Sequence, residues 1–259
     1  MRKNIAIIGG TGMKELFESS MIEGFGYHKQ AQWIERKRNR YGSVPVTIQD
    51  VEKEGQAYRL QFLHRHHGIG TTPPHAINYH ANVRSVGDFQ PEVVVTVQSV
   101  GSLHRNFPPG MLGLVKDYID FTGRVSTFHN DTAVHTDLFG HFSREHRPKL
   151  VDLLASQSED DLELELIVAQ MTGPQFESPA EIRALQIMGA TAVGMTLVPE
   201  AKLIAELDIP QVALVVSSNW GSGFDPRGDV EIDHHKVEAR AKQLHALIWR
   251  SIVTVMENL

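Results

Sequence analysis

Short apolar runs alternate with amphipathic stretches along the whole chain, and no other feature of the sequence constrains the fold as strongly. Short apolar runs are typical of buried strands, and amphipathic stretches are typical of helices that cover a sheet, so the pattern predicts an α/β protein. The expected strands are Ile5–Ile8, Val46–Gln49, Arg59–Leu63, Val93–Gln98, Leu112–Val115, Leu164–Ala169, Ala192–Gly194 and Val212–Ser217. The expected helices are Ala76–Val83, Pro148–Ala155, Pro179–Met188, Pro199–Glu206 and a long one from Asp233 to about Met256.

The sequence contains no internal repeat, no low-complexity segment and no Gly/Ser-rich linker. A chain of 259 residues is long enough to bury a sizeable core, and we expect residues 1–259 to form a single domain. Two polar stretches, Gln30–Tyr41 and Gln157–Asp161, are expected to be solvated excursions on the surface of that domain.

Composition excludes several classes of protein. The formal net charge of −6 argues against a nucleic-acid partner, which normally requires a basic patch. The chain has no cysteine, which excludes disulfides and thiolate metal sites and fits a reducing cytosol. The N-terminal apolar run is too short for a signal peptide, and no later run approaches membrane-spanning length. We therefore expect a soluble cytoplasmic protein without a membrane or nucleic-acid partner.

The segment Gly194–Glu200 places a methionine and a threonine side by side at the carboxyl end of an expected strand. Ligands of open α/β sheets bind at this end of the strands. Thr196 can donate a hydrogen bond to an anion, while Met195 can pack under an apolar ring or a sugar face. The alternative is an ordinary strand-to-helix turn with a methionine in the core.

Two further strand ends carry groups suited to an anion. Gly9–Gly12 follows the first strand, and its backbone N–H groups and the Thr11 hydroxyl can approach an oxyanion, although a plain tight turn is an equal alternative. The segment is neither a Walker motif nor a dinucleotide fingerprint. Arg65 and His66 follow the third strand and suit recognition of phosphate or carboxylate. The neighbouring His64 and His67 could indicate a metal site, but consecutive residues of an extended segment point to opposite faces, and we expect no metal.

Other segments could contact a flat heterocycle. Gln98–Leu103 closes a strand with small and hydroxyl residues, which is typical of a site built from backbone donors. Phe176 is available for stacking on a ring, although a core position is the commoner outcome for an isolated aromatic. Asn219 offers both a donor and an acceptor to a base edge, and its alternative is a turn residue that bonds nearby backbone.

Taken together in this order, the segments resemble the purine nucleoside phosphorylase superfamily, and most closely its methylthioadenosine phosphorylase branch. The resemblance runs from Ile5 to the C-terminal helix. The matching segments are Gly9-Gly10-Thr11-Gly12, Arg65-His66, Asn78-Tyr79 with Ala81-Asn82, Gly101-Ser102-Leu103, Gly173-Pro174 with Phe176, and Met195-Thr196 with Pro199-Glu200. The resemblance implies an α/β fold around a mixed, partly barrel-like sheet, assembled as a homotrimer with sites near the subunit interfaces. It also implies reversible phosphorolysis of a purine nucleoside, with inorganic phosphate as co-substrate and no other cofactor.

The resemblance also implies roles for the residues at matching positions. The implied phosphate-binding residues are Gly10, Thr11, Arg65, His66, Ser99 and Thr196. Met195 would lie under the ribose, Phe176 on the base, and Asn219 at the base edge, where it would act in catalysis together with Arg65 and His66. The remaining implied substrate contacts are Val100, Gly101, Trp220, Gly221 and Ile232, with His135 reaching into the site of a neighbouring subunit.

The sequence departs from the adenosine-type pattern at the base edge, where that branch has aspartates at the positions of Asn219 and Gly221. A carboxylate accepts from a 6-amino group, whereas a 6-oxopurine requires donors that an amide supplies. A buried mismatch costs about 1–3 kcal/mol, so we expect 6-oxopurines to be preferred. Ile232 matches an apolar position that lines the methylthio pocket of that branch, and it makes S-methyl-5′-thioinosine the first expected substrate, although the nearby His235 is polar where the family is apolar.

Two other departures and several alternatives remain open. Thr172 replaces a glutamate that precedes Gly-Pro in the family, and Gln98 or Ser99 stands for a phosphate-contacting threonine. The chain could instead be a methylthioadenosine phosphorylase proper, or a general inosine/guanosine phosphorylase. It could also be a nucleosidase that uses water, against which Arg65 and the two threonines argue, or a non-catalytic purine-binding protein that kept the fold.

Overall fold

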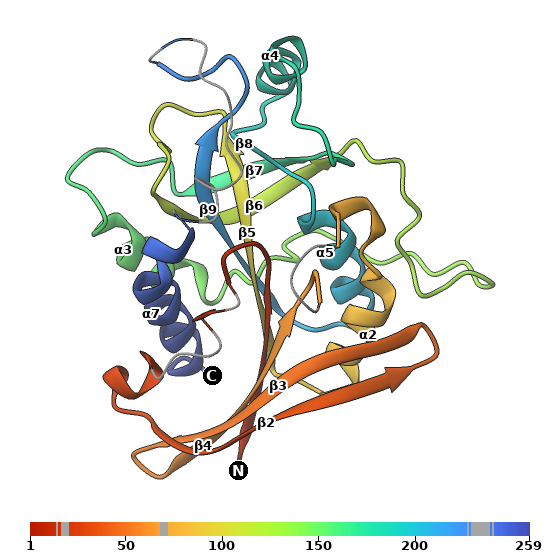
Figure 1. Cartoon of the computed structure of the whole chain (residues 1–259), viewed down its shortest axis with the longest axis vertical. Helices are drawn as coiled ribbons and strands as arrows, with labels where there is room; N and C mark the ends of the chain where they lie inside the picture. The colour runs from red at the N-terminus through yellow and green to blue at the C-terminus, as the bar shows by residue number, and fades with distance from the viewer. Residues whose placement is uncertain (14, 17–20, 68–71, 227, 229–238, 240) are drawn as a thin grey trace.

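The structure is a computed structural model that describes residues 1–13, 15–16, 21–67, 72–226, 228, 239 and 241–259. In this part of the chain nine strands form one mixed sheet in the order β2-β3-β4-β1-β5-β8-β7-β6-β9, and β9 also pairs with β5. The strands are β1 Lys3–Gly9, β2 His28–Asn39, β3 Gly42–Lys53, β4 Gln56–His64, β5 Val93–Ser102, β6 Leu112–Asp120, β7 Glu165–Gln170, β8 Ala192–Gly194 and β9 Gln211–Trp220. The return pairing closes β5 to β9 into a ring, so the predicted partly barrel-like α/β sheet is confirmed (Figure 1).

Parallel pairing brings the ends of distant strands to one place. β1 pairs in parallel with both β4 and β5, so that Gly9 lies opposite His64 on one side and Val97 on the other. β5 continues in parallel with β9, and β7 with β8, where Gln170 lies opposite Gly194. Continuous apolar runs are expected for strands that are covered on both faces, and the interiors of β1, β5 and β9 are buried throughout. The carboxyl ends of these strands therefore meet at one edge.

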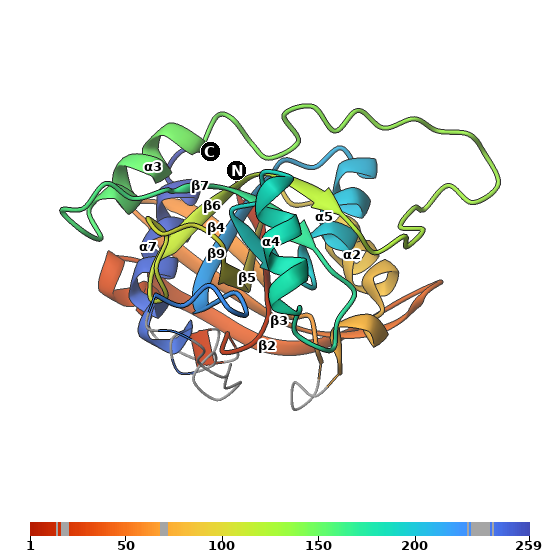
Figure 2. The same ribbon diagram turned by 90° about the horizontal axis from the view of Figure 1, so that it is seen from above.

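Helices cover both sides of the sheet (Figures 1 and 2). They are α2 Tyr79–Asp88, α3 Arg147–Ala155, α4 Pro179–Ile187, α5 Leu197–Glu206 and α7 His245–Met256, with short 3-10 turns at η1 Met21–Phe25 and η2 Pro74–Ala76. α2 packs against α5, and α3 packs against α7. A capping box starts α4, because the Ser178 hydroxyl accepts from the Glu181 N–H and the Glu181 carboxylate accepts from the Ser178 N–H. No described helix is both long and apolar enough to cross a membrane.

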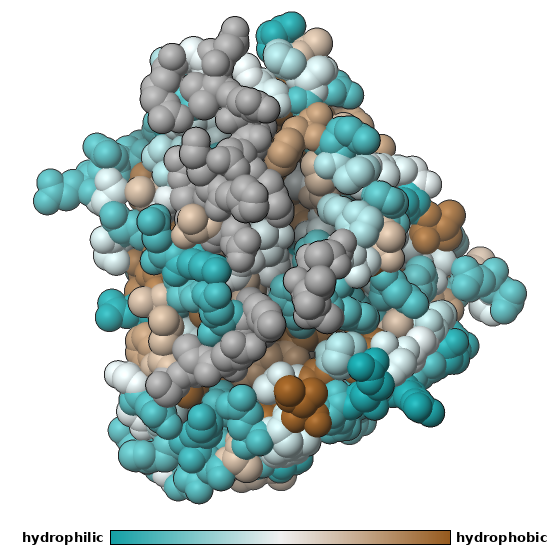
Figure 3. Space-filling model, viewed as in Figure 1, coloured by the Kyte–Doolittle hydropathy of each residue, from teal (hydrophilic) through white to brown (hydrophobic). Residues whose placement is uncertain are grey.

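The sequence predicts a solvated excursion at Gln30–Tyr41, and this prediction is wrong. Most of the segment belongs to β2, which pairs antiparallel with β3 along its length at the edge of the sheet. The face shown in Figure 3 carries mostly hydrophilic side chains, and β2 itself is largely exposed. Charged side chains on an edge strand prevent it from pairing with other chains, so the apolar alternation that identifies an inner strand is missing here.

Two helices start two or three residues away from their predicted starts. Ala76 belongs to η2, and α2 begins at Tyr79 because the Asn78 side chain caps it by accepting from the Ala81 N–H. α5 begins at Leu197, two residues before Pro199, which still lies in the first turn where proline is tolerated. The last helix is observed as α7, and its predicted start at Asp233 lies outside the described residues.

Candidate active site

A cavity of about 190 Å³ lies where the strands end. Its walls come from the segments that follow β1, β4, β7 and β8 and from the carboxyl ends of β5 and β9. The lining residues are Thr11, Arg65, His66, Pro74, Ser99, Val100, Gly101, Pro174, Phe176, Glu177, Val193, Gly194, Met195, Thr196, Ser218, Asn219 and Gly221. The arginine that follows β4 and the methionine–threonine pair that follows β8 therefore share one cavity, although they are 130 residues apart in the sequence.

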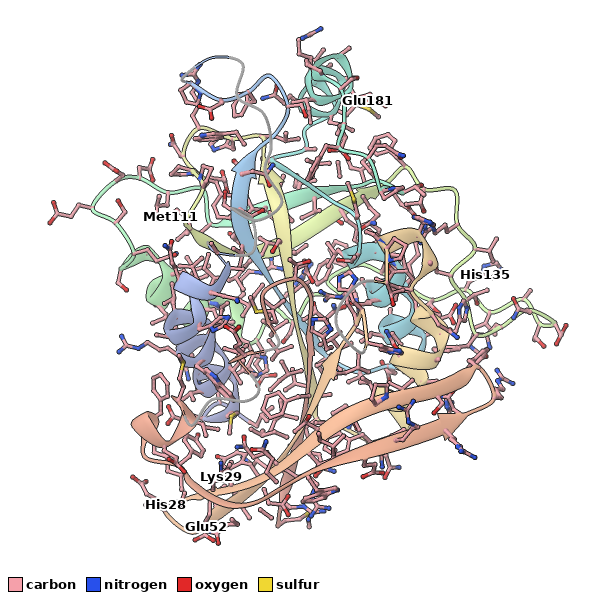
Figure 4. The ribbon with its side chains drawn as sticks, in the orientation of Figure 1. His28, Lys29, Glu52, Met111, His135 and Glu181 are labelled. Carbon is pink, nitrogen blue, oxygen red and sulfur yellow. The ribbon has the colours of Figure 1, made fainter. Side chains whose placement is uncertain are left out.

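Three expected site residues in the described part of the chain, Gly10, Trp220 and His135, are absent from the lining of this cavity. Gly10 lies directly behind it, against the Arg65 guanidinium. Trp220 packs edge-on against Phe224, with ring centroids 5.6 Å apart. His135 is exposed on the long connection between β6 and α3, which extends outward beyond α2 and α5 (Figures 2 and 4). Ile232, like His235, lies outside the described residues.

The Arg65 guanidinium is fixed inside the protein below the cavity. Its Nε lies 2.8 Å from Oε1 of Glu200, its Nη2 lies 3.0 Å from Oε2, and both side chains are fully buried. Nη1 donates to the Val97 carbonyl at 2.9 Å. Burial raises the pKa of the Glu200 carboxyl, and the Arg65 guanidinium opposes that shift. The Glu200 carboxylate therefore binds the Arg65 guanidinium with both of its oxygens, and the two opposite charges cancel.

Gly10 leaves the space that Arg65 occupies. A Cβ atom at this position would lie 2.2 Å from Arg65 Nη1, which no side chain could tolerate without moving the guanidinium. The Gly10 N–H also donates to the Val97 carbonyl at 3.2 Å, so the loop after β1 is held against β5. The glycine predicted to bring backbone toward an anion thus also admits the arginine.

The segment after β4 is held by its own side chains. Nδ1 of His66 lies 2.7 Å from the Thr72 carbonyl oxygen, so Nε2 is the ring nitrogen that points away from this carbonyl. Nε2 of His67 lies 2.6 Å from Oδ1 of Asn82, whose Nδ2 donates to the Arg65 carbonyl at 3.1 Å. Burial, reinforced by His66 and Arg65, lowers the pKa of His64 to about 4, so its imidazole is neutral near pH 7.

Hydroxyl groups also lie among the residues that line the cavity. The Ser99 Oγ is buried and has no hydrogen-bond partner among the described residues. Thr196 precedes α5, but its side chain makes no capping bond to that helix. Gln98 is buried next to Ser99, and its Oε1 accepts from Arg65 Nη2 at 3.4 Å. Buried polar groups are normally hydrogen-bonded, so the unpaired Ser99 hydroxyl is a candidate for contact with a ligand.

The lining of the cavity also includes a flat ring, a carboxylate and an amide, which belong to Phe176, Glu177 and Asn219. Phe176 is half-exposed there, whereas Glu177 is buried and Asn219 is partly buried. Burial raises the pKa of the Glu177 carboxyl. Sequence reasoning missed Glu177, because the family pattern places a carboxylate at the position of Thr172, which does not line the cavity. The signal was present in the same loop, directly after the phenylalanine.

Among the described residues, no three histidine, aspartate or glutamate side chains are grouped so that they could hold a metal ion. The partners of the nearby histidines are carbonyl and amide oxygens instead. The cavity is thus lined by residues that carry hydroxyl, imidazole and guanidinium groups and by residues that carry an aromatic ring, a carboxylate and an amide. This arrangement suits a ligand in which an anion lies next to a flat polar heterocycle.

The structure is thus an α/β fold around a mixed sheet, with a cavity at the carboxyl ends of its strands. The Phosphorylase superfamily matches residues 28–253 in a comparison with protein families, and the chain belongs to that family. The resemblance inferred from the sequence is therefore confirmed.

Two relatives illustrate the sequence similarity. The chain is 34% identical over 223 residues to a probable S-methyl-5′-thioinosine phosphorylase of Methanothermobacter thermautotrophicus, covering 86% of this chain and 73% of that protein. It is 30% identical over 229 residues to the 6-oxopurine nucleoside phosphorylase of Pyrococcus furiosus, covering 85% and 80%.

Solved structures match the fold. A methylthioadenosine phosphorylase from an antarctic soil metagenomic library superposes with a TM-score of 0.80 at 24% identity, covering 99% of this chain and 87% of that one. A methylthioadenosine phosphorylase from Schistosoma mansoni superposes with a TM-score of 0.79 at 20% identity, covering 97% and 90%. At these identities the structures establish the architecture alone.

Proposed function

We propose that this enzyme cleaves a 6-oxopurine nucleoside by phosphorolysis, giving the free purine and a ribose 1-phosphate, and that S-methyl-5′-thioinosine is its preferred substrate. One observation carries the proposal: a single cavity brings potential anion donors together with an amide and a carboxylate. Relatives named for S-methyl-5′-thioinosine and for 6-oxopurine nucleosides support it.

Phosphate would bind at the end formed by Thr11, His66, Ser99 and Thr196, above the Arg65 guanidinium. Because Glu200 already neutralises Arg65, hydroxyl groups, the imidazole and the one remaining guanidinium N–H would meet the charge of the dianion. The glycosidic bond breaks with oxocarbenium character, so phosphate fixed below the anomeric carbon is both nucleophile and counter-charge.

The base would bind between Phe176, Glu177 and Asn219. A 6-oxopurine carries a donor at N1 and an acceptor at O6, which match a carboxylate and an amide N–H. The N1–H would compensate the Glu177 carboxylate that burial disfavours. Asn219 would also stabilise the departing purine through a hydrogen bond near N7, which lowers the cost of breaking the bond. Adenine has the opposite pattern at N1 and N6 and would leave both groups mismatched.

The sugar end decides between S-methyl-5′-thioinosine and an ordinary nucleoside such as inosine. Met195 would lie under the ribose, and its thioether suits an apolar sugar face. The methylthio assignment rests on the names of relatives and on the resemblance at Ile232. A general 6-oxopurine nucleoside phosphorylase is the second candidate, because other relatives carry that name.

We also propose a cytoplasmic homotrimer that needs no cofactor besides phosphate. The connection that carries His135 exposes Val125 and Phe139, whose relative exposures are 78% and 81%. A neighbouring copy would cover these apolar side chains and receive His135 at its own cavity.

A panel of four nucleosides tests the function. Methylthioinosine, methylthioadenosine, inosine and adenosine are each incubated with and without phosphate, and kcat/KM is measured from base release. The proposal requires phosphate-dependent cleavage with methylthioinosine first. Higher kcat/KM for the adenine nucleosides contradicts the base assignment, and equal cleavage of inosine contradicts the sugar assignment. Cleavage without phosphate identifies a nucleosidase, and no cleavage identifies a binding protein.

A further inference from the structure

Strand β9 contains an irregularity beside the cavity. β5 and β9 pair in parallel with Val100 opposite Ser217, but the next pair is Gly101 opposite Asn219. Ser218 is therefore an extra residue in β9, which is a β-bulge. Consecutive residues of a regular strand point to opposite faces, whereas the consecutive residues Ser218 and Asn219 both line the cavity. The bulge brings a hydroxyl next to the amide that would read the base.

The hydrogen bonds around Asn219 fix which end of its amide is the donor. The Ser218 Oγ donates to Asn219 Oδ1 at 2.9 Å, and Asn219 Nδ2 donates to the Trp220 carbonyl at 2.8 Å. Each Nδ2 carries two hydrogens, so one remains to face the cavity. In the reversed orientation, Oδ1 would face the Trp220 carbonyl and present an acceptor to the base.

Among the described residues, two acceptors lie within reach of the Ser218 hydroxyl, which has only one hydrogen to donate. Its Oγ lies 3.1 Å from the Val100 carbonyl as well as 2.9 Å from Asn219 Oδ1. When it donates to Asn219, the amide is locked with its N–H toward the cavity. The Trp220 carbonyl can only accept, so it and the donating Ser218 hydroxyl favour the same orientation of the amide.

We propose that Ser218 is a positioning residue that sets the orientation of the Asn219 amide and so establishes the preference for a 6-oxo over a 6-amino purine. This inference rests on the proposed function and deepens it, because it names the group that makes Asn219 a donor. Gly101 has a supporting part: a Cβ at this position would lie 3.2 Å from Asn219 Nδ2 and would press on the amide from the other strand.

The test measures kcat/KM for inosine and adenosine, which differ at C6, in the wild type and in Ser218→Ala. We expect the inosine-to-adenosine ratio to fall by about tenfold in Ser218→Ala, the equivalent of one net hydrogen bond. Ser218→Thr keeps the hydroxyl and should keep the ratio. Gly101→Ala should lower the ratio from the opposite side of the amide, which gives an independent second variant.

Ser217→Ala is the matched control. Ser217 is the preceding residue of β9, is fully buried, and donates to the Phe107 carbonyl at 3.2 Å without lining the cavity. Its loss should lower the melting temperature without changing the ratio, which separates a loss of stability from a loss of orientation. A folded Ser218→Ala enzyme with the wild-type ratio overturns this inference alone. A wild type that prefers adenosine, or cleaves neither nucleoside, overturns the proposed function and this inference with it.

Discussion

Arg65 and Glu200 form a buried, bidentate ion pair beneath the cavity, with Nε–Oε1 at 2.8 Å and Nη2–Oε2 at 3.0 Å. The pair joins the segment after β4, which lines the cavity, to helix α5, which begins directly after the lining residue Thr196. It positions the guanidinium and removes most of its net charge. The anion that we propose would therefore bind next to a fixed ion pair that has no net charge.

Glu200→Ala should destabilise the protein strongly. The substitution leaves the Arg65 guanidinium buried and unpaired, which typically costs about 3–5 kcal/mol. Urea unfolding measures the loss. Asp88→Ala is the control, because Asp88 pairs with Arg84 on the exposed surface of α2, and such pairs contribute about 0.3–0.5 kcal/mol. Equal losses in the two variants would show that the buried pair has no special role.

Ser99→Ala should raise the KM for phosphate severalfold and leave the free energy of unfolding nearly unchanged. The Ser99 hydroxyl is buried without a partner in the described part of the chain, so its removal breaks no bond within the protein. Ser85→Ala is the matched control, because the Ser85 hydroxyl in α2 is equally buried and unpaired but does not line the cavity. An unchanged KM for phosphate in Ser99→Ala would remove this residue from the anion site.

Asn219→Asp should move the preference from inosine toward adenosine by about ten- to a hundredfold in the ratio of kcat/KM, because a carboxylate accepts from a 6-amino group and repels O6. Glu177→Gln should lower activity on inosine more than on adenosine, since it weakens the acceptor that faces N1–H. Glu181→Gln serves as the control, because Glu181 is exposed in the first turn of α4 (Figure 4). Ratios that stay constant in both site variants would contradict the assigned base end.

Stability should depend on the protonation of His64. Burial lowers its folded-state pKa from 6.5 to about 4, so the imidazole stays neutral in the folded chain while the unfolded chain takes up a proton. The contribution of the neutral His64 imidazole to the free energy of unfolding is complete above about pH 6.5 and is lost as the pH falls toward 4. Below pH 6 the slope should approach about 1.4 kcal/mol per pH unit for this one proton.

Urea unfolding between pH 6 and 4.5 measures that slope in the wild type and in His64→Gln. The slope of the free energy of unfolding against pH should be smaller in His64→Gln by the equivalent of about one proton. Burial also lowers the pKa values of His141 and His146, and their contributions to the slope remain in both proteins. His28→Gln, on exposed β2, should keep the wild-type slope (Figure 4). A His64→Gln slope equal to that of the wild type would contradict the prediction.

The inner strands could be predicted from sequence because they are buried on both faces, and continuous apolar runs as short as Ile5–Ile8 and Val93–Gln98 are typical of such strands. β2 could not, because an edge strand is selected for charge and exposes most of its side chains. Thr11, Arg65 and Thr196 could be proposed as anion contacts from their places after strands, and all three line the cavity. The closed ring of β5 to β9 was implied by the resemblance alone, since strand order is not visible in local patterns.

The finer chemistry of the site depends on contacts that sequence spacing does not encode. The Arg65–Glu200 pair joins residues far apart in the chain, although each belongs to a segment that resembles the family. The bulge at Ser218 shifts the pairing of β9 with β5 by one residue. No hydrophobic pattern in the sequence indicates such a shift. Glu177 was overlooked because burial, rather than sequence position, distinguishes it from an ordinary surface carboxylate.

The fate of phosphate tests the central claim most directly. Phosphorus NMR can follow the wild-type enzyme with methylthioinosine and inorganic phosphate while hypoxanthine release is measured in the same sample. We predict that a sugar 1-phosphate resonance grows in step with hypoxanthine, one for one, and that neither product forms without phosphate. Release of hypoxanthine with inorganic phosphate as the sole phosphorus signal would contradict the account.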